Sequence, residues 1–198
     1  MEDVTLGPFL IASGLLIVTG AFKVVSPSGV TGAIGAIGAR VPRWAGRVLG
    51  LGEMTLGVSA FVVPGRSLAT MVALGYLVLA GVVLLLRRRG AESCGCFGEI
   101  TSPPSLTHLS FNLMAAVAAA AHTAVGGTPP IEQIGIGSPG GWPLIALLTV
   151  VGIGAALTLL TALPAVLAET EAARAAAERQ HDRDHGREHR LGMPVKPT

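Results

Sequence analysis

The residues best suited to chemistry are Cys94 and Cys96, the only two cysteines of the chain, which stand in the sequence Cys-Gly-Cys. A disulfide between them would close a small ring, and the flexible Gly95 helps the backbone to reach the required geometry. Such a bond is strained and easily reduced, and its short loop removes little entropy from the unfolded chain, so it suits exchange better than bracing. We therefore predict a redox pair, in which either cysteine could supply the attacking thiolate.

Two other interpretations of the pair stay open. Cys94, Cys96 and His108 are soft ligands that could hold a metal ion, although no further ligand is evident and His108 falls within a predicted helix. The pair could also be an incidental turn. His181, His185 and His189 recur every four residues near the C-terminus and could bind a metal on one helix face, but charged tails often contain histidine, so no metal site is predicted there.

Four polar residues fall within or at the edge of apolar segments: Lys23, Glu53, His108 and Asn112. Ionisable groups in hydrocarbon cost about 3 kcal/mol on insertion scales, so they usually face the bundle interior and pair with one another. Glu53 could pair with Lys23 or His108, and Asn112 shares a helix face with His108 because the two are four residues apart. Such an interior could bind a quinone or relay a proton. It could equally be a clamp of hydrogen bonds between helices, and Lys23 could instead extend to the interface.

The elements that must position these residues are transmembrane helices. Of the 198 residues 51% are hydrophobic and only 13% are charged, against roughly 25% in soluble domains. A helix needs about 20 residues to cross the hydrocarbon core of a bilayer, and five apolar spans are long enough to do so. They are approximately Leu6 to Val25, Trp44 to Val63, Ser67 to Leu86, Leu106 to Val125, and Trp142 to Leu167. The fold class is therefore all-α, a polytopic protein embedded in the lipid bilayer, and a net charge of +2 gives no indication of nucleic-acid binding.

The loops and the C-terminal tail complete this organisation. The segment from Ser26 to Pro42 could form a short interfacial helix or be flexible. Seven glycines in the first three spans indicate close helix packing: Gly14, Gly20, Gly50, Gly52, Gly57, Gly75 and Gly81. We predict a core over 1–125, a loop and a fifth transmembrane helix over 126–167, and a charged, largely disordered tail over 168–198, after an alanine-rich helical continuation.

Orientation follows from the loops that contain lysine and arginine. With five spans, nearly all arginines fall on one side of the membrane and Arg66 lies on the other. The sequence thus predicts a multi-pass protein of the plasma membrane with its N-terminus outside and its C-terminus in the cytoplasm. The loop with Cys94 and Cys96 would then be at the cytoplasmic surface.

The Cys-Gly-Cys-Phe-Gly stretch at 94–98, between the third and fourth spans, resembles the MauE family of methylamine-utilisation membrane proteins, relatives of the DoxX-like proteins. Three further stretches resemble that family: Gly-Ala-Phe-Lys at 20–23, Leu-Gly-Glu-Met-Thr-Leu-Gly at 51–57, and Phe-Asn-Leu at 111–113. The resemblance covers about residues 5–125, and the cysteine motif is its most specific part. The fifth span and the tail lie outside it.

The resemblance implies a four-helix membrane bundle that acts with a thioredoxin-like partner. In the family this role is the maturation or transport of the disulfide-rich small subunit of methylamine dehydrogenase, and a general thiol–disulfide function is the broader expectation. Disulfide formation in exported proteins needs cysteines outside the cytosol, whereas the arginines place them inside. A non-catalytic membrane scaffold, a transporter subunit and a metal-handling protein are the alternative functions.

Overall fold

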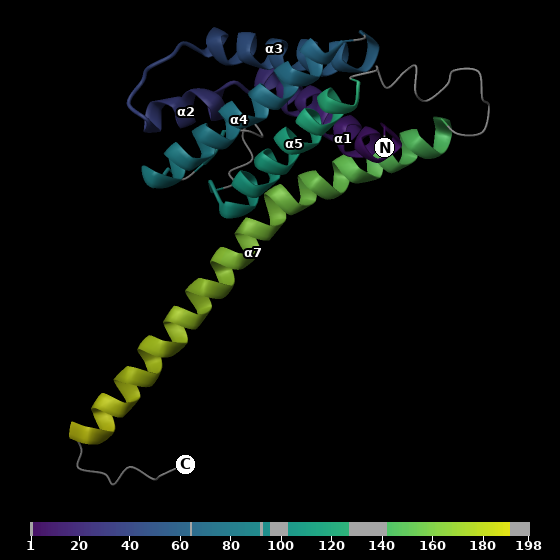
Figure 1. Cartoon of the computed structure of the whole chain (residues 1–198). Coiled ribbons are helices and arrows are strands. Elements are labelled where there is room, and N and C mark those ends of the chain that lie inside the picture. The colour runs from purple at the N-terminus through teal and green to yellow at the C-terminus, as the bar shows by residue number, and fades with distance from the viewer. Residues whose placement is uncertain (1, 64, 92, 96–102, 127–141, 191–198) are drawn as a thin grey trace.

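The computed structural model describes residues 2–63, 65–91, 93–95, 103–126 and 142–190, and the predicted all-α fold is confirmed over these residues. The helices are α1 (Glu2–Val25), α2 (Ser28–Ala36), α3 (Arg43–Val62), α4 (Arg66–Arg88), α5 (Leu106–Val125) and α7 (Trp142–Arg190). The first five form a bundle, and α7 lies against the bundle with its first half and then runs away from it (Figure 1). The short α2 occupies part of the segment whose structure the sequence left open.

Four of the described helices are long and apolar enough to cross a membrane: α1, α4, α5 and the first half of α7. The predicted second span, Trp44 to Val63, does form a helix of suitable length, but α3 is not among these four. Arg43, Arg47 and Glu53 lower its hydropathy, because each charged residue offsets several apolar ones. Large apolar side chains are exposed along α4 and α7, as expected where helices face lipid.

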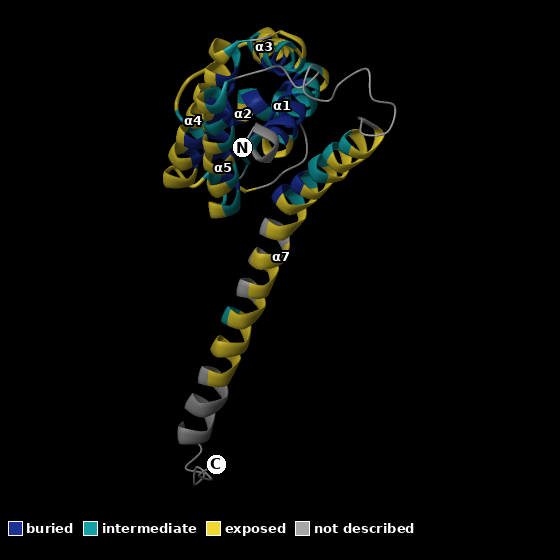
Figure 2. Cartoon of the chain, turned by 45° about the vertical axis from the view of Figure 1, so that its right-hand side comes forward, coloured by how far each residue is buried: buried dark blue, intermediate teal, exposed yellow. Residues whose placement is uncertain are grey.

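The central helix of the bundle is α1, which contacts α3, α5 and α7. Phe9, Ala12 and Leu16 of α1 belong to a buried cluster that also contains small and aromatic residues of α4 and α5. The hydroxyl of Tyr76, buried in α4, donates a hydrogen bond of 2.6 Å to the carbonyl oxygen of Ala12. This bond joins α4 to α1 within the buried part of the bundle, which is dark blue in Figure 2.

Glycines bring α1 and α3 into close, antiparallel contact. A Cβ atom added to Gly20 would lie 2.5 Å from the carbonyl oxygen of Gly50, and one added to Gly57 would lie 2.7 Å from that of Ser13. Residues later in α1 thus meet residues earlier in α3. The expected packing role holds for these glycines and for Gly14, whose Cβ would collide with Ile153 of α7.

The packing prediction is wrong for other glycines of the set. A Cβ atom at Gly52 or Gly81 would meet no atom within 4 Å, and one at Gly75 would meet only Leu56 Cδ2, at 3.9 Å. These three glycines lie in α3 and α4, whose contact is much looser than that of α1 with α3. The same residue type therefore closes one helix interface and leaves another open.

The tail differs from the expectation of disorder in the part that the structure describes. Helix α7 continues without interruption to Arg190, and Gly186 does not end it. The alanine-rich stretch at 168–177 favours this continuation, because alanine has the highest helix propensity. Residues 191–198 of the predicted tail, and nearly all of the loop at 126–141, lie outside the described residues.

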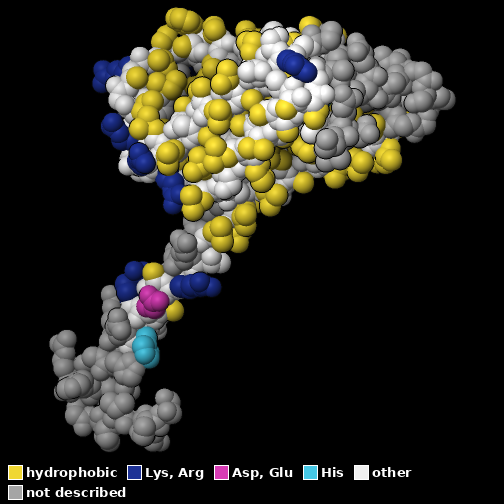
Figure 3. Space-filling model, in the orientation of Figure 1, with side chains coloured by type: hydrophobic (Ala, Val, Ile, Leu, Met, Phe, Trp, Pro, Cys, Tyr) yellow, Lys and Arg dark blue, Asp and Glu magenta, His cyan; other side chains and the backbone are white. Residues whose placement is uncertain are grey.

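Positive side chains gather at one end of the bundle, as the face drawn in Figure 3 shows. The ends of helices that meet there are the end of α1, the start of α3 and the end of α4, which carries Arg87, Arg88 and Arg89. Arg66, at the start of α4, lies at the other end of that helix from Arg87 and Arg88. The segment with Cys94 follows α4 directly, so it belongs to the arginine-rich end.

Candidate functional site

Lys23 and Glu53 form a buried ion pair. Lys23 Nζ of α1 lies 2.5 Å from Glu53 Oε2 of α3, and Lys23 is only 2% exposed. The contact of Gly20 with Gly50 brings the two helix backbones together one turn away from this pair. The structure thus selects Lys23, and not His108, as the partner of Glu53, and Lys23 does not extend to the interface.

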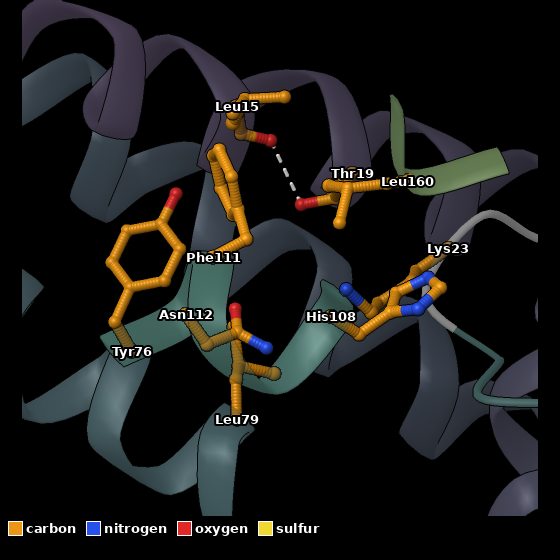
Figure 4. A pocket seen from close by; sticks show the side chains of 9 residues that line it. All are labelled: Leu15, Thr19, Lys23, Tyr76, Leu79, His108, Phe111, Asn112 and Leu160. Atoms are coloured by element: carbon orange, nitrogen blue, oxygen red, sulfur yellow. Dashed lines mark hydrogen bonds between the residues drawn. The ribbon is translucent and has the colours of Figure 1, made fainter. Parts of the chain in front are cut away.

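A small internal cavity lies beside Lys23, as shown in Figure 4. It has about 30 Å³ of open space, enough for about one or two water molecules by the usual requirement. Its lining combines polar and apolar side chains: Leu15, Thr19, Lys23, Tyr76, Leu79, His108, Phe111, Asn112 and Leu160. Three of the four predicted interior residues therefore line one cavity, and the fourth, Glu53, is joined to it through Lys23.

His108 is fixed by the start of its own helix. The Ser105 hydroxyl caps α5 by accepting a hydrogen bond from the backbone N–H of His108, at 3.3 Å. The same oxygen lies 2.8 Å from His108 Nδ1, so the cap also orients the imidazole ring. Ser105 is thus the N-cap residue of α5, a position at which serine is strongly preferred. Asn112, one turn further along, is also buried.

Cys94 is buried next to the same region, with an exposed fraction of 4%. It packs in a cluster with Leu160 of α7, and partly buried residues of three helices surround the two: Phe22, Phe111 and Leu157. Phe111 and Leu160 also line the internal cavity, so only a layer of side chains separates the cysteine from the polar interior. Cys96, the second residue of the predicted redox pair, lies outside the described residues.

Helix α2 covers the residue between the two cysteines. Gly95 has a φ of +67°, a conformation that favours glycine, and a Cβ atom there would lie 2.5 Å from the carbonyl oxygen of Gly29. Its N–H donates a hydrogen bond of 3.2 Å to the Ser93 hydroxyl. Glycine at position 95 therefore permits the positive φ between the two cysteines. It also permits the close contact with Gly29, which the sequence did not reveal.

Besides Ser13, three polar residues of the interior were missed from the sequence: Thr19, Tyr76 and His122. His122 is 1% exposed, stacks on Phe9 with a ring-centroid distance of 4.2 Å, and lies 3.3 Å from Thr5 Oγ1 through its Nδ1. A signal existed for each. His122 follows His108 by fourteen residues, close to four helical turns, Thr19 precedes Lys23 by one turn, and Tyr76 is the only tyrosine of the chain.

The metal interpretation gains no support within the described residues, where no group of three histidine, cysteine, aspartate or glutamate side chains could hold a metal ion. Of the three tail histidines, the exposure of His181 alone is described, and it is exposed. A set that includes Cys96 falls outside this test.

The family model described as methylamine utilisation protein MauE matches residues 3–125. The chain belongs to the MauE family. This match covers well over half of the chain and includes α1 to α5, with the Lys23–Glu53 pair, His108, Asn112 and the cysteine motif. Searches of curated proteins and of solved structures found no match.

In this MauE protein, the site extends beyond the part that the family model covers. Leu157 and Leu160 of α7 enclose Cys94, and α7 lies after the matched residues. Family membership and the four apolar helices together make the chain a membrane protein of the methylamine-utilisation type.

Proposed function

We propose that this protein is a membrane thiol–disulfide exchange protein in which Cys94 and Cys96 cycle between a dithiol and a disulfide. The observation that carries the proposal is the enclosure of Cys94 beside a polar interior, at 4% exposure, in a two-cysteine chain of the MauE family. A sulfur held in this way is protected from unselective oxidation. The strain expected of a disulfide with one intervening residue makes the pair easy to reduce.

The exchange needs one partner with its own pair of thiols. A thiolate of the partner attacks a sulfur of the Cys94–Cys96 disulfide, and a mixed disulfide forms while the other cysteine leaves as a thiolate. The second partner thiolate then attacks the mixed disulfide, so the partner becomes oxidised and the Cys94–Cys96 pair gains two electrons. A thioredoxin-like protein has this chemistry, and the family's link to methylamine utilisation suggests the small subunit of methylamine dehydrogenase as the final client.

The enclosure of Cys94 gives the two cysteines different roles in this proposal. A partner thiolate cannot reach a sulfur that Leu157, Leu160 and two phenylalanines enclose, so we expect it to attack Cys96 and to release Cys94. Cys94→Ser should then leave Cys96 able to retain the partner as a stable mixed disulfide, whereas Cys96→Ser should retain at least tenfold less. Both yields are measured by non-reducing electrophoresis after adding a thioredoxin-like protein that lacks its second cysteine and carries thionitrobenzoate on its first. The remaining thiolate of the variant attacks the partner's sulfur in this disulfide, the mixed disulfide forms, and thionitrobenzoate leaves as a thiolate.

Each outcome of this experiment has a clear meaning. Equal trapping by the two variants would overturn the division of roles, and trapping by neither would overturn the exchange function. The latter result would favour a non-catalytic scaffold or a transporter subunit, in which substitution of the cysteines has no effect. Wild-type protein in its dithiol form, with the same partner, is the control, because its second cysteine can attack the mixed disulfide, form the Cys94–Cys96 disulfide and release the partner thiol.

The side of the membrane on which the pair works is a separate part of the proposal. The arginine-rich end of the bundle is expected to be cytoplasmic by the distribution of positive residues, but maturation of an exported client needs an outward-facing pair. A maleimide that cannot cross the membrane, applied to intact cells before and after reduction, distinguishes these arrangements. Labelling only after reduction supports an outward-facing disulfide and client maturation. Labelling only in opened cells supports a cytoplasmic source of electrons.

A further inference from the structure

A second hollow lies between α3 and α4, on the other side of Glu53 from the internal cavity. It has a volume of about 460 Å³, within the range of about 300 to 1,000 Å³ that is usual for small-molecule sites. Nine residues line it: Leu16, Val48, Leu49, Gly52, Glu53, Leu56, Gly75, Val78 and Leu79. We call this hollow the α3–α4 groove.

Two glycines keep the groove open. Gly52 of α3 has open space where its Cβ would be, and a Cβ at Gly75 of α4 would only touch Leu56 Cδ2, at 3.9 Å. Neither glycine is therefore needed for close packing of the helices. Because neither glycine has a side chain, the backbones of α3 and α4 are uncovered where they border the groove. This leaves room for a flat group between the two helices.

The groove contains a single polar side chain, that of Glu53. Lys23 donates a hydrogen bond to Oε2 of the Glu53 carboxylate. The other oxygen of Glu53, Oε1, makes no hydrogen bond within the described part of the chain. In the ion pair with Lys23, the oxygens of this carboxylate accept hydrogen bonds. Lys23 itself lines the internal cavity and not the groove. The groove therefore offers one strong acceptor and no side-chain donor.

The edges of the groove are exposed. Val48, Leu49 and Val78 are 58%, 45% and 64% exposed, and Val78 lies on α4, which is long and apolar enough to cross a membrane. A ligand would thus enter from the membrane, bring an apolar body and place a hydrogen-bond donor against Glu53. An acyl chain of a lipid satisfies the first two requirements and lacks the donor.

We propose that the α3–α4 groove binds the hydroxylated ring of a membrane-dissolved quinol, with a ring O–H donating to Glu53 and the apolar tail lying along α3 and α4. A charge-assisted hydrogen bond of this kind is among the stronger ones in proteins. The oxidised quinone carries only carbonyl oxygens, which cannot donate to a carboxylate. The groove should therefore prefer the reduced form. The proposal concerns binding alone and is independent of the thiol function, because the ion pair and Leu79 separate the groove from the cavity beside Cys94.

The experiment uses the full-length protein in detergent, with thermal unfolding as the readout, since a ligand of the folded state raises the transition temperature. The probes are decylubiquinol, decylubiquinone and 1-decanol, titrated under anaerobic conditions. We expect decylubiquinol to raise the transition temperature, with an apparent affinity at least about tenfold above that of decylubiquinone, as the loss of a hydrogen bond to a charged group implies. Decanol, with an O–H but no ring, should be weaker still.

Three variants locate the site. Gly75→Leu should abolish the response to decylubiquinol by filling the groove. Gly81→Leu is the matched control, because it adds the same side chain to the same helix, into open space and outside the groove, and should keep the response. The pair of substitutions Lys23→Met and Glu53→Gln removes both charges together, and it should reduce the preference for the quinol to less than threefold.

The results that would overturn the proposal are equally specific. They are no response in the wild type, equal responses to decylubiquinol and decanol, which would indicate an ordinary lipid-facing surface, or an unchanged response in Gly75→Leu. The titration is repeated in Cys94→Ser, Cys96→Ser protein. A response there shows that the groove binds its ligand even if the exchange function fails, and loss of the response confined to this variant would also contradict the proposal.

Discussion

The two faces of α3 use the same residue types in opposite ways. Toward α1, Gly50 and Gly57 permit backbone contacts so close that no Cβ fits, and they seal the interface around an ion pair. Toward α4, Gly52 and Gly75 together leave the α3–α4 groove open, with a volume of about 460 Å³. Glu53 stands between these faces and belongs to both. The comparison shows that a glycine in a membrane helix either brings a neighbour close or keeps it away, according to the face on which it lies.

The largest effect should come from breaking the charge pair at the boundary of the two faces. Lys23→Met leaves the buried Glu53 without its partner, and removing one member of a buried pair typically costs about 3–5 kcal/mol. Unfolding in a titration with sodium dodecyl sulfate measures the loss. The double variant Lys23→Met, Glu53→Gln should recover at least half of it. A Lys23→Met variant as stable as the wild type would show that the closed face does not depend on the pair.

A smaller loss is expected at the closed face. In Gly50→Ala the new Cβ would lie 2.5 Å from the carbonyl oxygen of Gly20, so α1 and α3 must separate. Overpacking of this kind costs about 1–3 kcal/mol. The same unfolding titration applies, and we expect a lower midpoint. An unchanged midpoint would mean that the α1–α3 contact is looser than the structure describes.

The smallest effect on the free energy of unfolding is expected at Gly52, two residues from Gly50, and it should be a gain in stability instead of a loss. Gly52→Ala adds a Cβ that meets no atom, and alanine is about 1 kcal/mol more favourable than glycine inside a helix. The free energy of unfolding should therefore stay equal or rise by up to that amount. If Gly52→Ala destabilised the protein as much as Gly50→Ala does, the contrast between the two faces would be lost.

The helices could be predicted from the sequence largely because lipid imposes their length. The predicted spans Leu6 to Val25 and Leu106 to Val125 agree with α1 and α5 to within a few residues, since apolar runs bounded by polar ones mark helix ends. The alanine-rich part of α7 at 168–177 was predicted as a helical continuation, but the helix beyond it, up to Arg190, was not. The charged end of α7 cannot bury apolar surface, so its composition indicated a disordered tail.

The part of the site that lies on a single helix could be predicted from the sequence. The four-residue spacing of His108 and Asn112 places them on one face, and both line the cavity. The choice of Lys23 as partner of Glu53 depends instead on the distance between two helices, which Gly20 and Gly50 set together. Nothing in either segment alone indicates that contact. For the same reason, Gly50 and Gly52 could not be assigned to opposite roles before the position of α1 was known.

Because α7 is long, it extends far beyond the bundle. The helix is anchored where Gly152 receives the Ile11 side chain, and it continues from there to Arg190 without a break. At 1.5 Å per residue, the stretch after Leu163 extends roughly 40 Å beyond the bundle. A tilt of only about ten degrees in the anchored half would move the far tip by roughly 7 Å. Since Leu157 and Leu160 cover Cys94, a single helix joins the cover of the cysteine to this distant tip.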